Sequence, residues 1–114
     1  MGRDIRQDSY LSRMILLNIT NIISDEIVDQ YMSWLQKEYI PLIQETKIFD
    51  EIKLLKILDS PNEGHSFSLQ LVASNLTDIT EFKQTLYLLL QQKMQGELQG
   101  QLFLFDSTMQ YLDY

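Results

Sequence analysis

The side chains that carry out most enzyme chemistry are scarce in this sequence. His65 is the only histidine, cysteine is absent, and the four glycines are too widely spaced for a phosphate-binding loop. A serine nucleophile needs a base beside it, but Ser66 follows His65 directly, and adjacent strand residues point to opposite faces. No acidic residues cluster at the spacing of metal ligands. We therefore expect no catalytic residue, no metal site and no cofactor.

The charge of the chain also excludes whole classes of partner. The formal net charge is −7, and the acidic residues are scattered rather than gathered into a tail. Nucleic acids and anionic membranes are bound by clustered Lys and Arg, and no apolar run approaches the roughly 20 residues that span a bilayer. With no cysteine and no signal-peptide pattern, we expect a cytoplasmic protein that binds neither nucleic acid nor membrane.

The first thirteen residues differ from the rest of the chain. Residues 1–13 are polar and irregular, and the apolar pattern begins at Met14. We expect residues 1–13 to be a flexible N-terminal extension and residues 14–114 a single domain, because domains typically hold about 100–150 residues. The sequence leaves open whether the natural start is Met1 or Met14.

Hydrophobic periodicity predicts the elements that would position any site. Alternating apolar residues predict strands over 15–22, 49–58, 66–73 and 102–112. Apolar spacings of three and four predict one helix from an N-cap at Ser24 to about Gln44, with a kink at Pro41 or a boundary near Ile40. They predict another helix capped by Thr77 or Asp78 and ended by Gly96 and Gly100. This order is the ferredoxin-like βαββαβ plan, an α+β fold with a four-stranded antiparallel sheet and two helices on one face.

The two faces of that sheet should differ, because two helices can cover only one of them. We expect the helices to cover Ile15, Leu17, Ile19, Phe67, Leu69, Leu71, Phe103 and Phe105. The other face would then hold Leu16, Asn18, Thr20, Leu55, Ile57, Ser68, Gln70, Val72, Leu104, Asp106 and Thr108. This face is not fully apolar, and it carries fewer Lys and Glu residues than a face exposed to water would. The mixture favours a second copy packed sheet to sheet over a sheet exposed to water.

The polar residues of the second face are the candidate site. They are Asn18, Thr20, Ser68, Gln70, Asp106 and Thr108. They would either bond to one another inside a sealed homodimer or line a pocket for a small molecule between the two copies. Cofactor-free oxygenation is the enzymatic alternative, because it needs only a dry pocket, an activated substrate and a few orienting polar groups.

The segments MILLNIT, KEYIP, FDEIKLLKIL and SFSLQL, in this order, resemble a bacterial family found mostly in Bacteroidetes. This is the domain-of-unknown-function family four-two-eight-six, and the resemblance covers residues 14 to about 112. The family is similar to the dimeric α/β-barrel proteins, which pair ferredoxin-like subunits through their sheets and include small monooxygenases. The resemblance implies a cytoplasmic homodimer and transfers no reaction. Relatives often carry histidine before the Ile-Pro pair, where this chain has Tyr39, which lowers the expectation of an enzyme.

Overall fold

The central sheet joins segments that lie far apart in the sequence. A computed structural model describes residues 14–61 and 63–114, so the extension predicted over residues 1–13 lies outside the described residues. Within these residues, four antiparallel strands pair in the order β2-β3-β1-β4. Their bounds are β1 Ile15–Ile23, β2 Glu51–Ile57, β3 His65–Ala73 and β4 Leu102–Gln110. This is the ferredoxin-like order, so the predicted α+β fold is confirmed.

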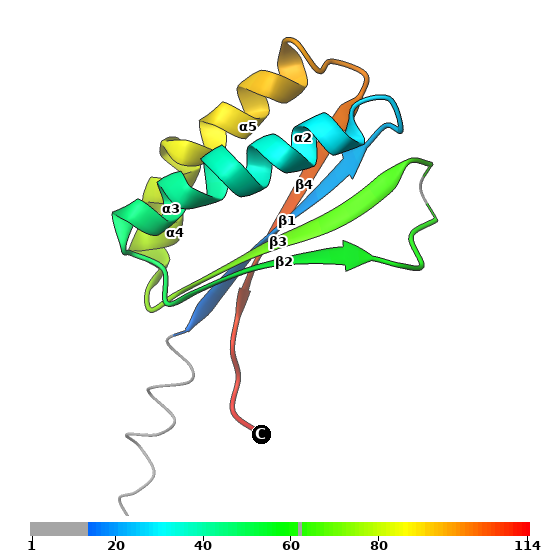
Figure 1. The fold of residues 1–114 in the computed structure, drawn as a ribbon. Coiled ribbons are helices and arrows are strands. Elements are labelled where there is room, and N and C mark those ends of the chain that lie inside the picture. The colour runs from blue at the N-terminus through cyan, green and yellow to red at the C-terminus, as the bar shows by residue number, and fades with distance from the viewer. Residues whose placement is uncertain (1–13, 62) are drawn as a thin grey trace, which may run out of the picture.

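The helices lie together on one face of this sheet (Figure 1). The first helical rod consists of α2 (Val28–Trp34), the π-helical turn η1 (Leu35–Tyr39) and α3 (Ile40–Thr46). The second consists of α4 (Leu76–Gln84) and α5 (Leu86–Gln95). The opposite face of the sheet has no helix over it in the described part of the chain.

The first rod differs in detail from the predicted helix. It begins at Val28 without a side-chain cap, and the Ser24 hydroxyl, predicted as the N-cap, has no hydrogen-bond partner in the described residues. The carbonyl of Ser24 instead accepts from the N–H of Ile27, 3.3 Å away, in a preceding turn. Pro41 lies in the first turn of α3, directly after η1. Since proline lacks the N–H that would bond four residues back, the wider π turn is the local adjustment before it.

The second rod starts earlier than predicted and is interrupted. The side chain of Asn75 caps α4 by accepting from the N–H of Asp78 at 2.9 Å, so the predicted caps Thr77 and Asp78 lie inside the helix. At Thr85 the backbone leaves helical geometry, with φ −126° and ψ −90°, and its hydroxyl donates to the carbonyl of Glu81 at 2.8 Å. A side chain that bonds back to its own helix in this way often accompanies a bend.

The core lies between the helical rods and the face of the sheet that they cover. Leu17 and Ile19 of β1 and Leu69 and Leu71 of β3 are completely buried there. The helices contribute side chains that are equally inaccessible: Leu35, Tyr39, Ile43, Ile79, Phe82 and Leu90. Burying an aliphatic or aromatic side chain of this size stabilises a fold by about 1.5–3 kcal/mol. This face therefore supplies most of the apolar burial that holds the helices on the sheet.

The face assignment predicted for the last strand is wrong. The register pairs Ile19 with Asp106 and Thr20 with Phe105, and residues directly opposite share a face. Leu104, Asp106 and Thr108 therefore lie on the helix side, and Phe103 and Phe105 lie on the other. Because Leu102, Phe103, Leu104 and Phe105 are all apolar, alternation alone cannot choose between the two frames, and a shift of one residue inverts every side chain.

The face without helices is called the open face below. It comprises Leu16, Asn18, Thr20 and Ile22 of β1, Glu51, Lys53, Leu55 and Ile57 of β2, Ser66, Ser68, Gln70 and Val72 of β3, and Phe103, Phe105, Ser107 and Met109 of β4. Apart from β4, the predicted division of the sheet into a covered and an open face is confirmed by this register.

Two glycines at the ends of the sheet adopt a left-handed backbone conformation. Gly64 precedes β3 with φ +83°, and a Cβ added there would lie 2.5 Å from the carbonyl oxygen of Ile23. Gly100 precedes β4 with φ +81°, and nothing lies within 4 Å of its added Cβ. Any other residue would be strained at both positions. At Gly64 a side chain would in addition collide with the backbone of Ile23, whereas Gly100 has free space around it.

Replacing each glycine by alanine separates the cost of the left-handed conformation from the cost of the collision with Ile23. We expect Gly100→Ala to lower the free energy of unfolding by about 1 kcal/mol, the cost of the left-handed conformation. Gly64→Ala should cost at least about 1 kcal/mol more, because the backbone of Ile23 must move away. Urea unfolding of the two variants measures both values. Equal losses would contradict the close approach at Gly64.

Candidate functional site: the open face of the sheet

A row of exposed apolar side chains follows β4 along the open face. Phe103, Phe105 and Met109 are 49%, 60% and 44% exposed, and Leu55 on the opposite edge strand is 44% exposed. Single exposed apolar residues are ordinary on protein surfaces. Aromatic side chains in a row on one flat face are instead typical of an interaction surface. The prediction that the helices cover Phe103 and Phe105 is wrong, because both lie on the open face.

The correct frame is set at Leu102, which the sequence does not distinguish from its apolar neighbours. In the structure Leu102 follows the turn after α5 directly, and its N–H donates to the carbonyl of Leu98 in that turn at 3.0 Å. Leu102, the first residue of the strand, is completely buried. Counting the alternation from Leu102 rather than from Phe103 gives the observed frame.

Four polar side chains lie at the centre of the open face and bond to one another. Gln70 Nε2 donates to Ser68 Oγ at 3.2 Å, Ser68 Oγ donates to Asn18 Oδ1 in a short contact, and Asn18 Nδ2 donates to Thr20 Oγ1 at 3.2 Å. We call these four residues the polar relay. They are four of the six polar residues predicted for a pocket or dimer face, and β1 and β3 bring them together through the pairs Asn18–Gln70 and Thr20–Ser68.

The other two predicted residues, Asp106 and Thr108, lie on the helix side of the sheet. Asp106 Oδ2 accepts from the hydroxyl of Tyr87 at 2.8 Å, and its Oδ1 accepts from Lys83 Nζ at 3.0 Å. These bonds tie the second helical rod to the edge strand β4. The prediction that Asp106 and Thr108 lie beside the polar relay is therefore wrong, because the register of β4 differs by one residue from the predicted frame.

The surroundings of Asp106 favour its charged form. Partial burial by itself would raise the pKa of this carboxyl, but the hydrogen bonds from Lys83 and Tyr87 and the charge of Lys83 outweigh it and hold the pKa below its ordinary value. Burial, followed by the hydrogen bond to Asp106, raises the pKa of Tyr87, so its hydroxyl stays protonated as the donor. The cluster is a structural clamp between helix and sheet.

The histidine and its neighbouring serine do not form a nucleophile and base. His65 Nε2 lies 2.7 Å from Asp25 Oδ1 at the surface, next to the end of β1. The Ser66 hydroxyl lies 2.9 Å from the hydroxyl of Ser60 on the open face. The two side chains thus point to opposite faces and have different partners, as strand geometry requires.

Tyr39, which directly precedes the Ile-Pro pair, is part of the core. Its side chain is completely buried, and its hydroxyl donates to the carbonyl of Leu86 at 2.8 Å, directly after the interruption at Thr85. Its ring stacks on Trp34 with centroids 5.3 Å apart. Burial raises the pKa of Tyr39 well above its ordinary value. Tyr39 therefore holds the two helical rods together and is placed as a packing residue.

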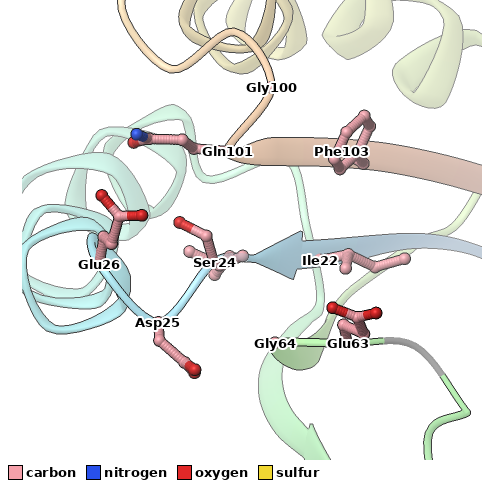
Figure 2. A pocket seen from close by; sticks show the side chains of 10 residues that line it. Ile22, Ser24, Asp25, Glu26, Glu63, Gly64, Gly100, Gln101 and Phe103 are labelled. Atoms are coloured by element: carbon pink, nitrogen blue, oxygen red, sulfur yellow. The ribbon is translucent and has the colours of Figure 1, made fainter.

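A pocket of about 360 Å³ lies at one end of the sheet, where β1 ends and β4 begins (Figure 2). Ile22 and Phe103 of the open face line it, together with the carboxylates of Asp25, Glu26 and Glu63. Asp25 is strongly exposed and already paired with His65. None of the polar relay belongs to its lining residues. The relay thus lies outside this pocket.

Within residues 14–61 and 63–114, no three His, Asp or Glu side chains come together as a metal site requires. No helix there is both long and apolar enough to cross a bilayer.

Comparison with known proteins agrees with the fold and assigns no chemistry. The sequence profile described as Domain of unknown function (DUF4286) matches residues 14–112, as the resemblance predicted. A crystal structure of a dimeric ferredoxin-like protein from an uncultured marine organism is similar to this chain, with a TM-score of 0.62 and 9% sequence identity. The match covers 89% of this chain and 96% of that chain. No curated protein matches. At this identity the likeness shows the fold alone.

Removing the carboxylate of Asp106 tests the clamp. We expect Asp106→Asn to lower the free energy of unfolding at pH 7 by about 1–2 kcal/mol, because Lys83 loses its charged partner. A lowered pKa in the folded state means that the carboxylate stabilises the fold above the ordinary Asp pKa of about 3.9 and that this contribution is lost as the pH falls through the folded value.

Urea unfolding between pH 7 and pH 2 checks this sign. The difference between wild type and Asp106→Asn should begin to shrink below about pH 3.9 and disappear once the pH is below the folded pKa of Asp106. Glu45→Gln, at an exposed position of α3, is the control and should change stability little at any pH. A difference that persists unchanged at the lowest pH would contradict the electrostatic origin of the clamp.

Proposed function

We propose that this chain, which belongs to the family described as Domain of unknown function (DUF4286), works as a homodimer joined through the open faces of its two sheets. The observation that carries the proposal is the row Phe103, Phe105 and Met109 on the open face. Covering apolar surface is favourable by roughly 25 cal/mol per Å². A second copy presents the same row, and a two-fold axis makes one patch complementary to itself.

The nature of the structural neighbour supports a homodimer. That ferredoxin-like protein is described as dimeric, and its fold is shared over most of this chain. We infer that the open face is the surface through which two such sheets meet, as in the dimeric α/β-barrel arrangement predicted from the sequence. The interior of the dimer would then be mixed, with aromatic residues of β4 beside the neutral polar relay of β1 and β3.

We propose that this interior is non-catalytic. The relay contains amides and hydroxyls, and none of these groups titrates near neutral pH. The ionisable residues of the open face are Glu51 and Lys53 on β2, whose charged groups lie 3.2 Å apart and are about half exposed. A cofactor-independent monooxygenase, the alternative from the sequence, loses its one carboxylate candidate, because Asp106 faces the helices. Proton transfer in such an enzyme would fall to substrate or water.

A small neutral molecule held between the two copies is the second candidate for the interior. The polar relay favours it, because amide and hydroxyl groups within apolar surroundings are typical of ligand sites. The surrounding Phe103 and Phe105 would supply flat apolar contacts. This candidate and a sealed interior both require the homodimer and differ in what the relay bonds to.

We also propose a bacterial cytoplasm as the location. The family resemblance and the absence of cysteine from the sequence support it, since oxidising compartments favour proteins with disulfides.

A charge placed in the aromatic row tests the homodimer. We expect Phe105→Glu to weaken dimerisation at least about 100-fold, because each dimer would bury two unpaired carboxylates. Leu76→Glu is the matched control: Leu76 is 58% exposed against 60% for Phe105 but lies on α4, in the helix layer. Light scattering after size exclusion measures the mass. A Phe105→Glu protein with the mass of the wild-type dimer would contradict the proposed interface.

Native mass spectrometry of the gently purified protein distinguishes the two interiors. A dimer with the mass of two bare chains is expected if the polar relay closes on itself. A dimer with additional mass would identify a bound small molecule and contradict a sealed interior. The test does not depend on guessing the ligand, because its mass is read directly.

A further inference from the structure

The hydrogen bonds of the polar relay all run in one direction. Gln70 donates to Ser68, Ser68 donates to Asn18, and Asn18 donates to Thr20. Each of the two inner residues therefore both accepts and donates within the relay. Chains of hydrogen bonds that run in one sense polarise and strengthen one another. The relay is thus a directed chain with two different ends.

The two ends carry complementary unused groups. Thr20 Oγ1 accepts from Asn18, so its own hydroxyl proton is left to donate. Gln70 uses its Nε2 toward Ser68, so its Oε1 is left to accept. Within residues 14–61 and 63–114 neither group has a further hydrogen-bond partner. A donor at one end and an acceptor at the other would satisfy each other if a second relay faced the first.

The register puts these ends at opposite corners of a four-residue block. Asn18 lies opposite Gln70, and Thr20 lies opposite Ser68 on the neighbouring strand. Thr20 and Gln70 therefore form one diagonal, and Asn18 and Ser68 form the other. When two sheets face each other, their two-fold axis lies in the plane between them. An axis in that plane, perpendicular to the Thr20–Gln70 diagonal and passing over its midpoint, brings Thr20 of each copy opposite Gln70 of the other.

We propose that the two copies are joined by this exchange: the hydroxyl of Thr20 in each copy donates to Gln70 Oε1 in the other. The proposal rests on the homodimer proposed above and specifies its register. The two relays then close into a ring of eight neutral side chains, in which each residue donates one hydrogen bond and accepts one within the ring. Such a ring buries no charge and leaves no unused end at the centre of the interface.

The ring gives the interface a specificity that the aromatic row lacks. Apolar contacts tolerate sliding, whereas a shifted register would leave Thr20 and Gln70 buried without partners, at a cost of about 1–3 kcal/mol for each group. Burial of the apolar side chains of the open face would supply affinity, with Phe105 of each copy over Val72 of the other in this register, and the ring would select a second copy of this chain in one orientation. An unrelated apolar partner would not offer the reciprocal donor and acceptor.

Two charged variants, purified separately and then mixed, test the exchange. A Gln70→Lys chain and a Thr20→Asp chain form one Lys–Asp pair and one native Thr20–Gln70 pair in the mixed dimer, but no opposite-charge pair in either homodimer. We expect the mixed dimer to exceed the statistical 1:2:1 distribution at least about 10-fold, read by native mass spectrometry. If neither variant dimerises alone, recovery of a dimer on mixing supports the exchange equally.

The matched control uses a residue of the same face outside the ring. Ser107 lies opposite Asn18 on β4, so a Ser107→Asp chain mixed with Gln70→Lys carries the same charges at a different place. We expect a much smaller excess of its mixed dimer. Equal excesses for the two mixtures, or a statistical distribution for the Thr20→Asp mixture, would overturn the exchange while leaving the homodimer intact. A wild-type chain that is monomeric would instead overturn the proposed function.

A neutral double-mutant cycle covers the case in which no charged mixture dimerises. Thr20→Val and Gln70→Met remove the donor and the acceptor with little change of shape, and each should weaken dimerisation about 10-fold. The double variant leaves neither the Thr20 donor nor the Gln70 acceptor without its partner, so it should dimerise more tightly than the product of the two single effects. Independent effects would contradict the exchange. A bound molecule whose mass disappears in both single variants would show that a ligand joins the ends instead.

Discussion

The covering of one face of the sheet by the helices is the constraint on which the remaining features depend. Leu17, Ile19, Leu69 and Leu71 are buried beneath the helical rods, and this side supplies the core. Alternation then forces the intervening residues of the same strands to the other side, whatever their type. The open face is therefore a consequence of the core, and its mixture of amides, hydroxyls and aromatic rings needs its own explanation.

The register of β4 decides what that face offers a partner. With Leu102 and Leu104 turned toward the helices, Asp106 reaches Lys83 and Tyr87 and binds the edge strand to the second rod. The same frame places Phe103 and Phe105 on the open face beside the neutral relay. A one-residue shift would exchange these roles, giving a charged open face and an aromatic core. The surface proposed for dimerisation and the clamp of the edge strand thus have a common cause.

The sequence was sufficient for the fold because strand and helix periods are distinct along most of the chain. The order of elements follows from these periods, and so do the faces of β1 and β3, where apolar and polar residues alternate clearly. The predicted caps were wrong because several residues near a helix start have side chains that can cap it. In α4 the cap is Asn75 rather than Thr77 or Asp78. For the site, four polar residues were found, but Asp106 and Thr108 were misplaced because the start of β4 is apolar at every position.

Sedimentation equilibrium of the unmodified protein tests the central claim most directly, because it needs no variant and no ligand. The claim is that the open face is covered by a second copy of the chain. We expect the mass of two chains at concentrations down to about 1 µM, because burial of the apolar row together with the relay should give at least this affinity. The mass of a single chain up to about 100 µM would contradict it.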